Sequence, residues 1–205
     1  RLLGNLTDNK EVESSGMTEE IKRAEYAIEN AKRGRKVCVI SSGDPGIYGM
    51  AGLVLELLKK NDLKKINIEI IPGIIAATAS AALLGAPLMH DFAVISLSDL
   101  LTDLELIESR IESAAKADFV IVLYNPKSTK RIAPFEKACC ILLKYKSPYT
   151  PVGVVQNAYR DNQRVSVVTL RDLASFKKIN MVTTIIIGNS KTYIKNKYMI
   201  TPRGY

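Results

Sequence analysis

The sequence of 205 residues predicts an α/β fold of two lobes, with a mostly parallel sheet in the first lobe and a mixed sheet in the second. Short apolar runs alternate with amphipathic segments along most of the chain, which is typical of a parallel sheet covered by helices. Turns that contain glycine follow several of the runs, at the strand ends where such sheets bind ligands. A pair of strands with no helix between them adds an antiparallel portion. We therefore expect a ligand cleft between the lobes.

The first lobe is expected to span residues 1–87. A helix is predicted from Thr18, because Glu19 and Glu20 suit the positive end of a helix and apolar residues then recur at helical spacing. Gly34 ends this helix. The elements that follow are a strand at 37–40, a helix that buries residues between 53 and 58, a strand at 68–71 and a helix of small residues at 74–84.

The second lobe is expected to span residues 88–205, because Gly85 and Pro87 interrupt the pattern just before it. The run at 119–123 is almost entirely apolar, as expected for a central strand covered on both faces. The helix at 132–145 is expected to turn Tyr145 inward with its other apolar residues. The remaining predicted elements are strands at 92–97, 152–155, 165–170 and 182–187, and a helix behind residues 102–105.

Composition limits the classes of protein to which the chain can belong. Its 47% hydrophobic residues are enough for a real core. The sequence has no apolar run long enough to cross a bilayer and no signal-peptide pattern, so we expect a cytoplasmic protein and no membrane partner. The three cysteines and the single histidine lack the spacing of metal ligands, so no metal site is expected.

The net charge of +8 lies mainly in the second part of the chain. Residues 1–89 contain 12 Lys and Arg against 11 Asp and Glu, whereas residues 90–205 contain 17 against 10. A basic surface indicates an anionic partner, either nucleic acid or a polycarboxylate, unless it serves only solubility. Binding of single-stranded nucleic acid requires basic residues interleaved with aromatics, and only residues 191–198 show this pattern. We therefore expect no nucleic-acid partner.

The turn at residues 41–49, SSGDPGIYG, is the first candidate site. Its three glycines allow positive φ angles and let a ligand approach the backbone. Asp44 has two interpretations: it caps the helix that follows, or it faces a partly cationic small molecule bound at the turn. The turn matches neither the phosphate-binding loop nor the dinucleotide fingerprint, so neither nucleotide interpretation is supported.

Polar residues of the second lobe form the other candidate site. His90 stands at its start, where a histidine beside a cleft acts as a general acid or base, or else makes one structural hydrogen bond at a hinge. The sequence has no GxSxG elbow, which disfavours a serine hydrolase. Two segments that follow strands either orient the carboxylates of a ligand or form ordinary solvated loops. Their polar residues are Ser96, Ser98, Asp99, Lys127, Ser128, Lys130 and Arg131.

Four stretches together resemble the tetrapyrrole (corrin/porphyrin) methylases, a family that uses S-adenosylmethionine. They are SSGDPGIYGMAG at 41–52, IPGIIAATASAALLGAPLMHDFAVISLSDLLT at 71–102, DFVIVLYNPKSTKR at 118–131, and TTIIIGNS with MITPRGY within 183–205. The resemblance covers essentially the whole chain. It implies the two-lobed fold of that family, with S-adenosylmethionine held in the cleft between the lobes.

The most specific stretches, GDPGIYGMAG and HDFAVISLSDLLT, resemble the members that methylate C17 of precorrin-3B or its cobalt form, with ring contraction, in cobalamin synthesis. A sulfonium methyl group is already activated, so such a site mainly aligns the substrate and excludes water. The positions that match the cofactor site of the family are Ser42, Gly43, Asp44, Ile47, Ile75, Ala76, Tyr124, Asn125, Ala158 and Thr184.

The implied substrate is an anionic tetrapyrrole, which gives the positive charge of the second lobe a reason. His90 is the candidate for the proton transfers of ring contraction, because of its position and because it is the only imidazole. The family habit also implies a homodimer. A methylase of the same fold that acts on a protein, as diphthine synthases do, is the alternative. The residues expected to contact the substrate are Ser96, Ser98, Asp99, Lys127, Lys130 and Arg131.

Three departures from the family pattern bear on this site. The family has a first strand and a glycine-proline-glycine loop ahead of the part that matches, so we expect one wall of the site to be missing from this sequence. Ile75 stands where the family usually has threonine, which removes a hydroxyl contact to the cofactor. Gln156 replaces an expected arginine, which removes one cation near the cleft.

Overall fold

The computed structural model describes residues 3–16, 19–129 and 131–205. By its contacts the chain divides into two compact units, with unit 1 ending at Ile75 and unit 2 comprising Ala76–Tyr205. The division falls before the helix of small residues, because that helix packs against strands of unit 2. The lobes expected at 1–87 and 88–205 remain a prediction, because a division by contacts does not test where the lobes of a family fold begin.

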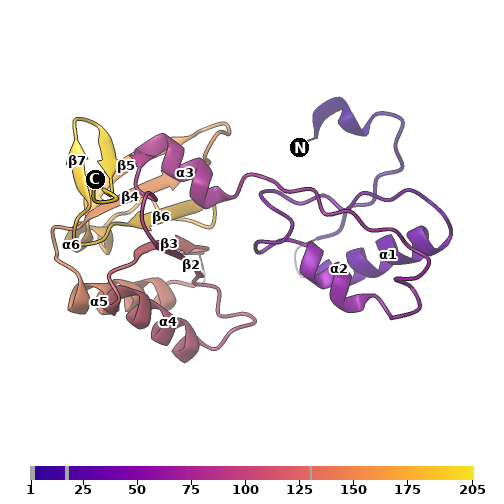
Figure 1. Ribbon diagram of the computed structural model, residues 1–205, viewed down its shortest axis with the longest axis horizontal. Coiled ribbons are helices and arrows are strands. Elements are labelled where there is room, and N and C mark those ends of the chain that lie inside the picture. Colours follow the sequence, from indigo (N-terminus) through magenta and orange to yellow (C-terminus); the bar gives the residue numbers. More distant parts are fainter. Residues whose placement is uncertain (1–2, 17–18, 130) are drawn as a thin grey trace. The chain divides into compact units, whose positions relative to one another are not determined.

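Unit 1 contains a short 3-10 helix, η1 (Gly4–Thr7), and the α-helices α1 (Glu20–Lys32) and α2 (Ala51–Leu57). α1 packs against α2, and its buried residues include Ala24 and Ile28, as the helical spacing predicts. The start expected at Thr18 lies outside the described residues. The purple part of the chain in Figure 1 shows α1 and α2 joined by long segments without regular structure.

The two strands predicted for the first lobe are wrong. No strand occurs among the described residues of unit 1, and the segments 37–40 and 68–71 are irregular. Ile40 is 56% exposed and Ile71 is 69% exposed, so neither segment is covered as a buried strand is. An apolar run becomes a strand only when a neighbouring backbone pairs with it, and these segments form no ladder. The mostly parallel sheet expected in the first lobe is therefore absent from the described part.

Unit 2 contains a mixed sheet of five strands, as expected. β2 and β3 are parallel, and the other neighbouring pairs are antiparallel. All five strands were predicted within one or two residues of their ends, because each contains an apolar run, and the runs of β3, β4 and β6 are buried along most of their length. In spatial order the strands are β2 (Phe92–Ser96), β3 (Val120–Tyr124), β6 (Thr183–Ile187), β4 (Pro151–Gln156) and β5 (Arg164–Thr169).

Helices cover both faces of this sheet (Figure 1). α3 (Ala76–Leu84) packs on β4 and β6, whereas α4 (Leu104–Lys116) and α5 (Ala133–Tyr145) pack together on the opposite side. A short helix, α6 (Leu170–Leu173), follows β5. The core between the sheet, α4, α5 and α6 includes the fully buried Phe135. None of the helices in the described ranges combines the length and the apolarity that crossing a membrane requires.

α3 lies very close to β4, as the run of small residues predicts. A Cβ atom on Gly153 of β4 would stand 2.2 Å from Cδ1 of Leu84, so the position tolerates no side chain without movement. Leu84 itself is almost completely buried. The absence of a side chain at Gly153 therefore sets the distance between helix and sheet.

A second, smaller sheet was not predicted. It has the order β1-β8-β7, and its strands are β1 (Gly85–Ala86), β8 (Tyr198–Ile200) and β7 (Tyr193–Lys195). Gly85, which we interpreted as part of a boundary, pairs with Met199 in parallel. Strands of two or three residues are too short to give a readable alternation of apolar and polar side chains.

Candidate functional site

The carboxylate of Asp44 joins two turns of unit 1. Its Oδ2 accepts a hydrogen bond of 2.9 Å from the backbone N–H of Gly73, and its Oδ1 accepts one of 2.8 Å from Gly46. These N–H groups, that of Gly73 above all, lower the pKa of Asp44 below its ordinary value, so the side chain is ionised near neutral pH. The interpretation of Asp44 as a helix cap is wrong, because the N-cap of α2 is Met50.

Both turns need glycine, Gly43 because of its positive φ angle and Gly73 because the other turn lies so close to it. Gly43 has a φ angle of +83°, and a Cβ atom on Gly73 would lie 2.2 Å from the carbonyl oxygen of Gly43. Ser42 and Ile47, which the family resemblance assigns to the cofactor, are exposed on the first turn. Ile75, the last residue of unit 1, is half-buried. Unit 1 thus presents an exposed turn whose Asp44 carboxylate is held by two backbone N–H groups.

In unit 2, Tyr124 connects the end of β3 to the start of α3. The backbone N–H of Ala77 donates a hydrogen bond of 2.8 Å to the Tyr124 hydroxyl oxygen. This N–H lies in the first turn of α3, where no helix carbonyl is available to accept it. The preceding residue, Ala76, is exposed. Tyr124 and Ala76, both assigned to the cofactor by the resemblance, are therefore brought together.

Ser96, at the end of β2, connects to the residue that follows β3. Its hydroxyl oxygen accepts hydrogen bonds from Nδ2 of Asn125 at 3.0 Å and from the backbone N–H of Ser98 at 3.2 Å. Asn125 has a φ angle of +50°, a conformation that asparagine adopts more readily than most residues. The parallel pairing of β2 with β3 places these residues at the same edge of the sheet.

Arg131 is held by the same strand ends. Its guanidinium donates to the carbonyl oxygens of Leu97 at 2.8 Å and Asn125 at 2.9 Å, and it lies 3.6 Å from the carboxylate of Asp99. The side chain is only 14% exposed. Its fork of donors therefore fixes the loops after β2 and β3, which makes Arg131 a positioning residue in this structure. Its direct contact with substrate remains a prediction.

The other two cations predicted to contact the substrate are Lys127 and Lys130. The ammonium of Lys127 lies 5.4 Å from the centre of the Phe135 ring, in a cation–π contact. Lys130 lies outside the described residues.

Thr184 and Ala158 lie at this same end of the sheet. β3 and β6 pair Leu123 with Ile185, so Tyr124 and Thr184 each lie one residue beyond that pair. Thr184 is buried and also pairs with Val155 of β4. Ala158 follows shortly after the end of β4 and is half-buried. The structure therefore brings the assigned residues of unit 2 together at one end of its sheet, with His90 as the exception.

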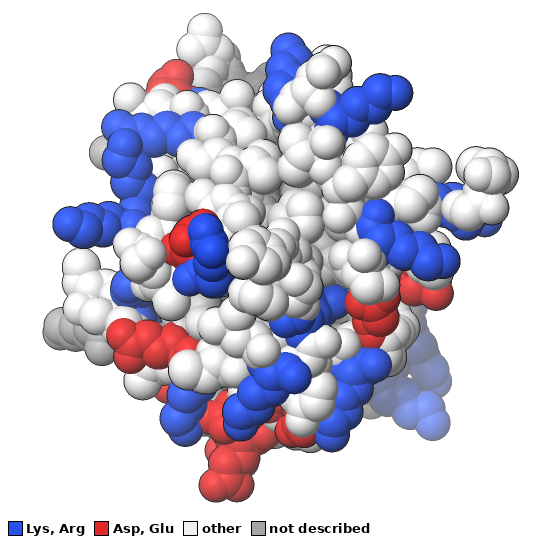
Figure 2. Space-filling view, turned by 90° about the vertical axis from the view of Figure 1, so that its left-hand side faces the viewer, with Lys and Arg blue, Asp and Glu red and all other residues white. Residues whose placement is uncertain are grey.

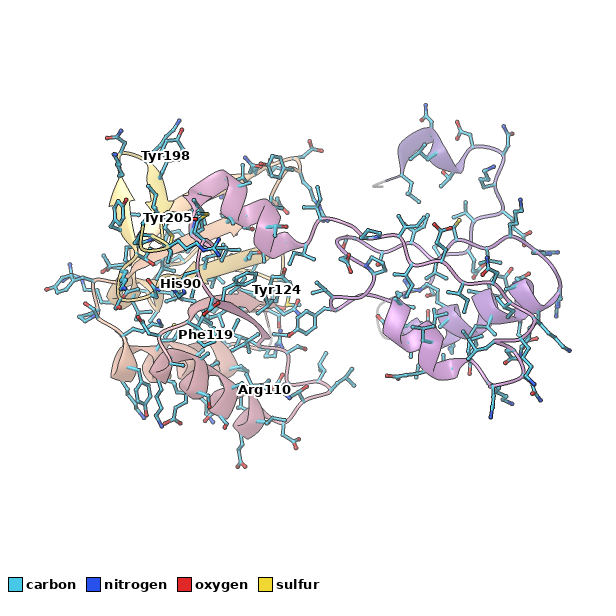
Figure 3. All side chains as sticks on the ribbon, viewed as in Figure 1. His90, Arg110, Phe119, Tyr124, Tyr198 and Tyr205 are labelled. Carbon is cyan, nitrogen blue, oxygen red and sulfur yellow. The ribbon has the colours of Figure 1, made fainter. Side chains whose placement is uncertain are left out.

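His90 lies at the opposite end of the sheet from Tyr124 (Figure 3). It precedes β2, whose five residues separate it from the Ser96 end by roughly 15 Å at about 3.3 Å per residue. Its Nδ1 accepts a hydrogen bond of 2.8 Å from the backbone N–H of Asp91. Within unit 2 the structure does not place His90 beside the other assigned residues, and its role as a proton-transfer group remains a prediction.

The partners that organise both candidate sites are backbone groups that the sequence did not reveal. Gly73 contributes an N–H to Asp44, Ala77 contributes an N–H to Tyr124, and Leu97 contributes a carbonyl to Arg131. Every residue has these groups, so no residue type signals them. Only the Gly73 position carried a hint, because glycine there allows the close approach.

The sequence matches the family model for the tetrapyrrole (corrin/porphyrin) methylases over residues 4–174. It is 53% identical over its whole length to the cobalt-factor III methyltransferase of Priestia megaterium, of which it spans 38%. It is 51% identical over 97% of its length to a probable cobalt-factor III C(17)-methyltransferase of Salmonella typhimurium, of which it spans 82%.

The fold agrees with that match. The crystal structure of the methyltransferase CobJ superimposes with a TM-score of 0.88 at 35% identity, covering 95% of this chain and 82% of the other. The fold is also shared with the uroporphyrin-III C-methyl transferase from Thermus thermophilus complexed with S-adenyl homocysteine. That structure has a TM-score of 0.63 at 22% identity, covering 88% of this chain and 77% of the other. The chain belongs to the tetrapyrrole (corrin/porphyrin) methylases.

Proposed function

We propose that the protein is an S-adenosylmethionine-dependent methyltransferase that methylates C17 of precorrin-3B or its cobalt form, with ring contraction, in cobalamin biosynthesis. The observation that supports this most directly is the identity of 53% and 51% to two cobalt-factor III methyltransferases along nearly the whole chain. Identity at that level, spread over both units, favours a shared substrate as well as a shared fold.

The chemistry of the Asp44 turn fits the proposed cofactor. S-adenosylmethionine has a positive sulfur and an ammonium group, and an ionised carboxylate on a glycine-rich turn attracts such a ligand. Aspartate is ionised at neutral pH, and the lowered pKa of Asp44 keeps its charge at more acidic pH as well. We assign cofactor contacts to Ser42, Gly43, Asp44, Ile47 and Ile75 of unit 1, and to Ala76, Tyr124, Asn125, Ala158 and Thr184 of unit 2.

When bound, the cofactor supplies a methyl group already activated by the sulfonium charge. The protein then has to bind and orient the two reactants and exclude water, and no nucleophilic side chain is required. Hydrogen bonds from Gly73 and Gly46 hold the Asp44 carboxylate in one orientation. Ala77 and Arg131 do the same for Tyr124 and for the Asn125 loop. Asp44, Tyr124 and Asn125 are thus held in place before any ligand binds.

The charge of unit 2 suits an anionic substrate. Figure 2 views the molecule from the unit 2 side and shows Lys and Arg side chains spread around an uncharged area, with fewer Asp and Glu. Two of the residues assigned to the substrate have polar groups that can still bind a ligand. The hydrogen bond of Ser98 to Ser96 uses only its backbone N–H. Among the described residues, the Lys127 ammonium contacts only the face of the Phe135 ring. Asp99 and Arg131 pair with each other at 3.6 Å, so they would contact substrate from an ion pair already formed.

Calorimetric titration with S-adenosylmethionine tests the cofactor assignment. We expect Asp44→Ala to weaken binding about tenfold or more, because it removes a charge that attracts the ligand and two turn hydrogen bonds. Asp161→Ala, which removes the same charge from an exposed loop, should bind as the parent does. Equal affinities for both variants would remove Asp44 from the site.

Mass spectrometry of precorrin-3B and cobalt-factor III after incubation with the protein and S-adenosylmethionine tests the reaction. One added methyl group per molecule supports the proposal, and a cofactor that binds without methylating either compound contradicts the substrate assignment. The homodimer and the cytoplasmic location also remain proposals. Light scattering in solution and cell fractionation, respectively, test them.

A further inference from the structure

A small polar cavity lies at the end of the unit 2 sheet opposite to the residues that we assign to the cofactor. Its volume is about 160 Å³, and it is found where β2 and β3 begin and β6 ends. The residues that line it are His90, Asp91, Ala117, Asp118, Phe119, Asn189 and Lys191. Both charged and amide side chains therefore face a space large enough for a small ligand.

Asn189 has a fixed orientation in this cavity. Its side-chain Oδ1 accepts hydrogen bonds from the backbone N–H of Lys191 at 3.0 Å and from the Thr192 hydroxyl at 3.1 Å. The backbone N–H of Asn189 donates to the same Thr192 hydroxyl oxygen at 2.9 Å. A backbone N–H can only donate, so the atom facing Lys191 must be the oxygen of the amide.

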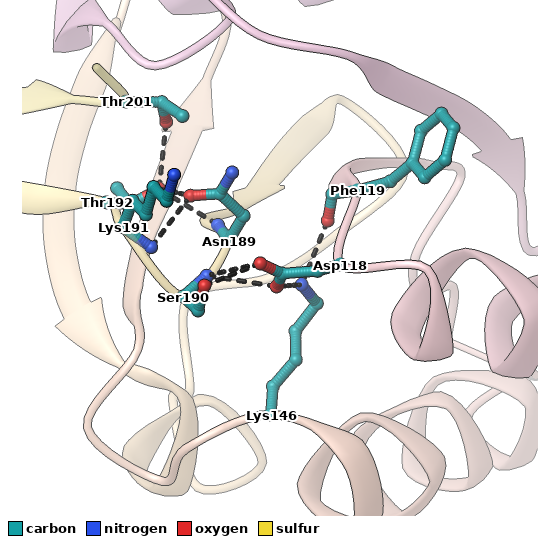
Figure 4. A network of polar contacts seen from close by, with 8 residues as sticks. All are labelled: Asp118, Phe119, Lys146, Asn189, Ser190, Lys191, Thr192 and Thr201. Carbon is teal, nitrogen blue, oxygen red and sulfur yellow. Dashed lines mark hydrogen bonds and ion pairs between the residues drawn. The ribbon is translucent and has the colours of Figure 1, made fainter. Parts of the chain in front are cut away.

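The side-chain amide nitrogen of Asn189, Nδ2, is therefore the atom without a hydrogen-bond partner among the described residues. The residue is 6% exposed, and Nδ2 has no acceptor among the described residues. Figure 4 shows this nitrogen pointing away from the partners of the oxygen. Nδ2 is not among the described side-chain atoms that are both fully buried and unpaired, so it reaches solvent and is available to donate to water or to a ligand.

The carboxylate of Asp118 is already neutralised by its neighbours (Figure 4). It accepts hydrogen bonds from the backbone N–H of Ser190 at 3.0 Å and from the Ser190 hydroxyl at 2.6 Å. It also lies 3.4 Å from the ammonium of Lys146, whose side chain is 2% exposed. Asp118 therefore contributes structure to the cavity rather than a free negative charge.

Two further donors line the same space. Because Nδ1 of His90 accepts the Asp91 N–H, the proton of the neutral ring is on Nε2, where it can be donated. The ammonium of Lys191 has no ion-pair partner within the described part of the chain. Asp91 is 79% exposed, so its charge is largely screened by water.

We propose that this cavity binds a small carboxylate, held by the Asn189 amide, the Lys191 ammonium and Nε2 of His90. One full positive charge and two neutral donors match the single charge and two oxygens of a carboxylate. A doubly charged phosphate would exceed the single positive charge that Lys191 supplies to the cavity. The carboxylate comes from a free organic acid or from a side arm of a larger ligand such as a tetrapyrrole. The inference rests on the cavity alone and does not require methyltransferase activity.

Nuclear magnetic resonance on the full chain tests the proposal. His90 is the only histidine, so its ring signals are assigned without ambiguity. In titrations with acetate at constant ionic strength, we expect saturable shifts of the His90 ring and of the Asn189 side-chain amide. Shifts that stay linear up to high acetate concentration would overturn the site.

Asn189→Asp provides a sharp variant, because it keeps the oxygen that Lys191 and Thr192 bind and replaces only the donor nitrogen by an acceptor. We expect it to weaken acetate binding about tenfold or more, since a donor to a charged group is lost and a negative charge is added. Asn196→Asp adds the same charge on an exposed turn and should leave binding unchanged. Equal weakening in both variants would show a general charge effect and contradict the proposal.

Competing ligands identify the source of the carboxylate. Inorganic phosphate that binds as tightly as acetate would overturn the ligand class. A soluble porphyrin with carboxylate arms that displaces acetate from the His90 signals would support the cavity as a site for a substrate arm. Displacement by succinate but not by the porphyrin would support a free organic acid. These outcomes are read from binding, so failure of methyl transfer leaves them unaffected.

Discussion

Asp44 accepts a hydrogen bond of 2.9 Å from the backbone N–H of Gly73, although 29 positions separate the two residues. The acid to which we assign a cofactor contact is therefore also the group that joins two turns of unit 1. Because one carboxylate serves both purposes, its replacement should change binding and stability together, and pH should affect both through the same group.

The pH dependence of stability gives the first prediction. The pKa of Asp44 is lowered in the folded protein by the N–H groups of Gly73 and Gly46. Such a group stabilises the fold above its unfolded pKa, and this stabilisation is lost as the pH falls through the lower folded pKa. We expect the thermal midpoint of the parent to fall more steeply below about pH 4 than that of Asp44→Asn, as followed by circular dichroism. Asp161→Asn should behave like the parent, and a common slope for all three proteins would contradict the role of Asp44.

Arg131→Lys should loosen the loops after β2 and β3. Lysine carries the charge but cannot reach both Leu97 and Asn125 with a planar fork, so at least one carbonyl loses its donor. We expect a loss of about 1–3 kcal/mol in the free energy of unfolding, measured by urea denaturation. Arg160→Lys, at an exposed position, serves as the control. An equal effect of the two substitutions would show that the fork geometry is unimportant.

Gly153 and Leu84 should show strong coupling in a double-mutant cycle. Gly153→Ala places a Cβ atom 2.2 Å from Leu84, and such overpacking costs about 1–3 kcal/mol. Leu84→Ala leaves a cavity that costs about 2–5 kcal/mol. In the double variant the new methyl group enters that cavity, so the loss in unfolding free energy should be smaller than the sum by about 1 kcal/mol or more. Additive losses would mean that β4 shifts to relieve the clash.

The three cysteines should react unequally with iodoacetamide. Cys38 and Cys140 are exposed, whereas Cys139 is buried, and burial raises the pKa of its thiol to about 12. The thiolate is the reacting form, so Cys139 should remain unmodified in the native protein at pH 8. Peptide mass spectrometry identifies the modified positions, with the protein in urea as the control in which all three react. Native modification of Cys139 at the rate of Cys140 would contradict its burial.

The central strands of the larger sheet, β3, β4 and β6, could be predicted because burial on both faces gives a nearly continuous apolar run. β3 (Val120–Tyr124) begins one residue from its expected start. The segment 37–40 has a similar apolar run but no neighbouring backbone to pair with in the described part, and pairing partners cannot be read from a run alone. Tyr145 was expected inside and is 40% exposed instead, because its hydroxyl donates to Glu112 at the surface.

The candidate site could be predicted as a set of positions but not as a set of contacts. Motif resemblance assigns Asp44, Tyr124 and Asn125 to the cofactor, which stays a prediction, and the structure shows what holds each of them in place. His90 is the opposite case. Its chemistry predicted a position beside the cofactor residues, but it precedes β2, and the direction of β2 puts it at the other end of the sheet. Residue type reports what a side chain can do, whereas strand direction decides what it can reach.

The parallel pairing of Gly85 with Met199 has a consequence for the order in which the chain folds. α3 and β1 are synthesised well before their partners β4, β6 and β8, which lie later in the sequence. Contacts between segments so far apart in the chain form slowly, because the intervening chain must first be ordered. The small apolar helix α3 therefore stays uncovered until β4 and β6 have been synthesised, and β1 stays unpaired until β8 follows them.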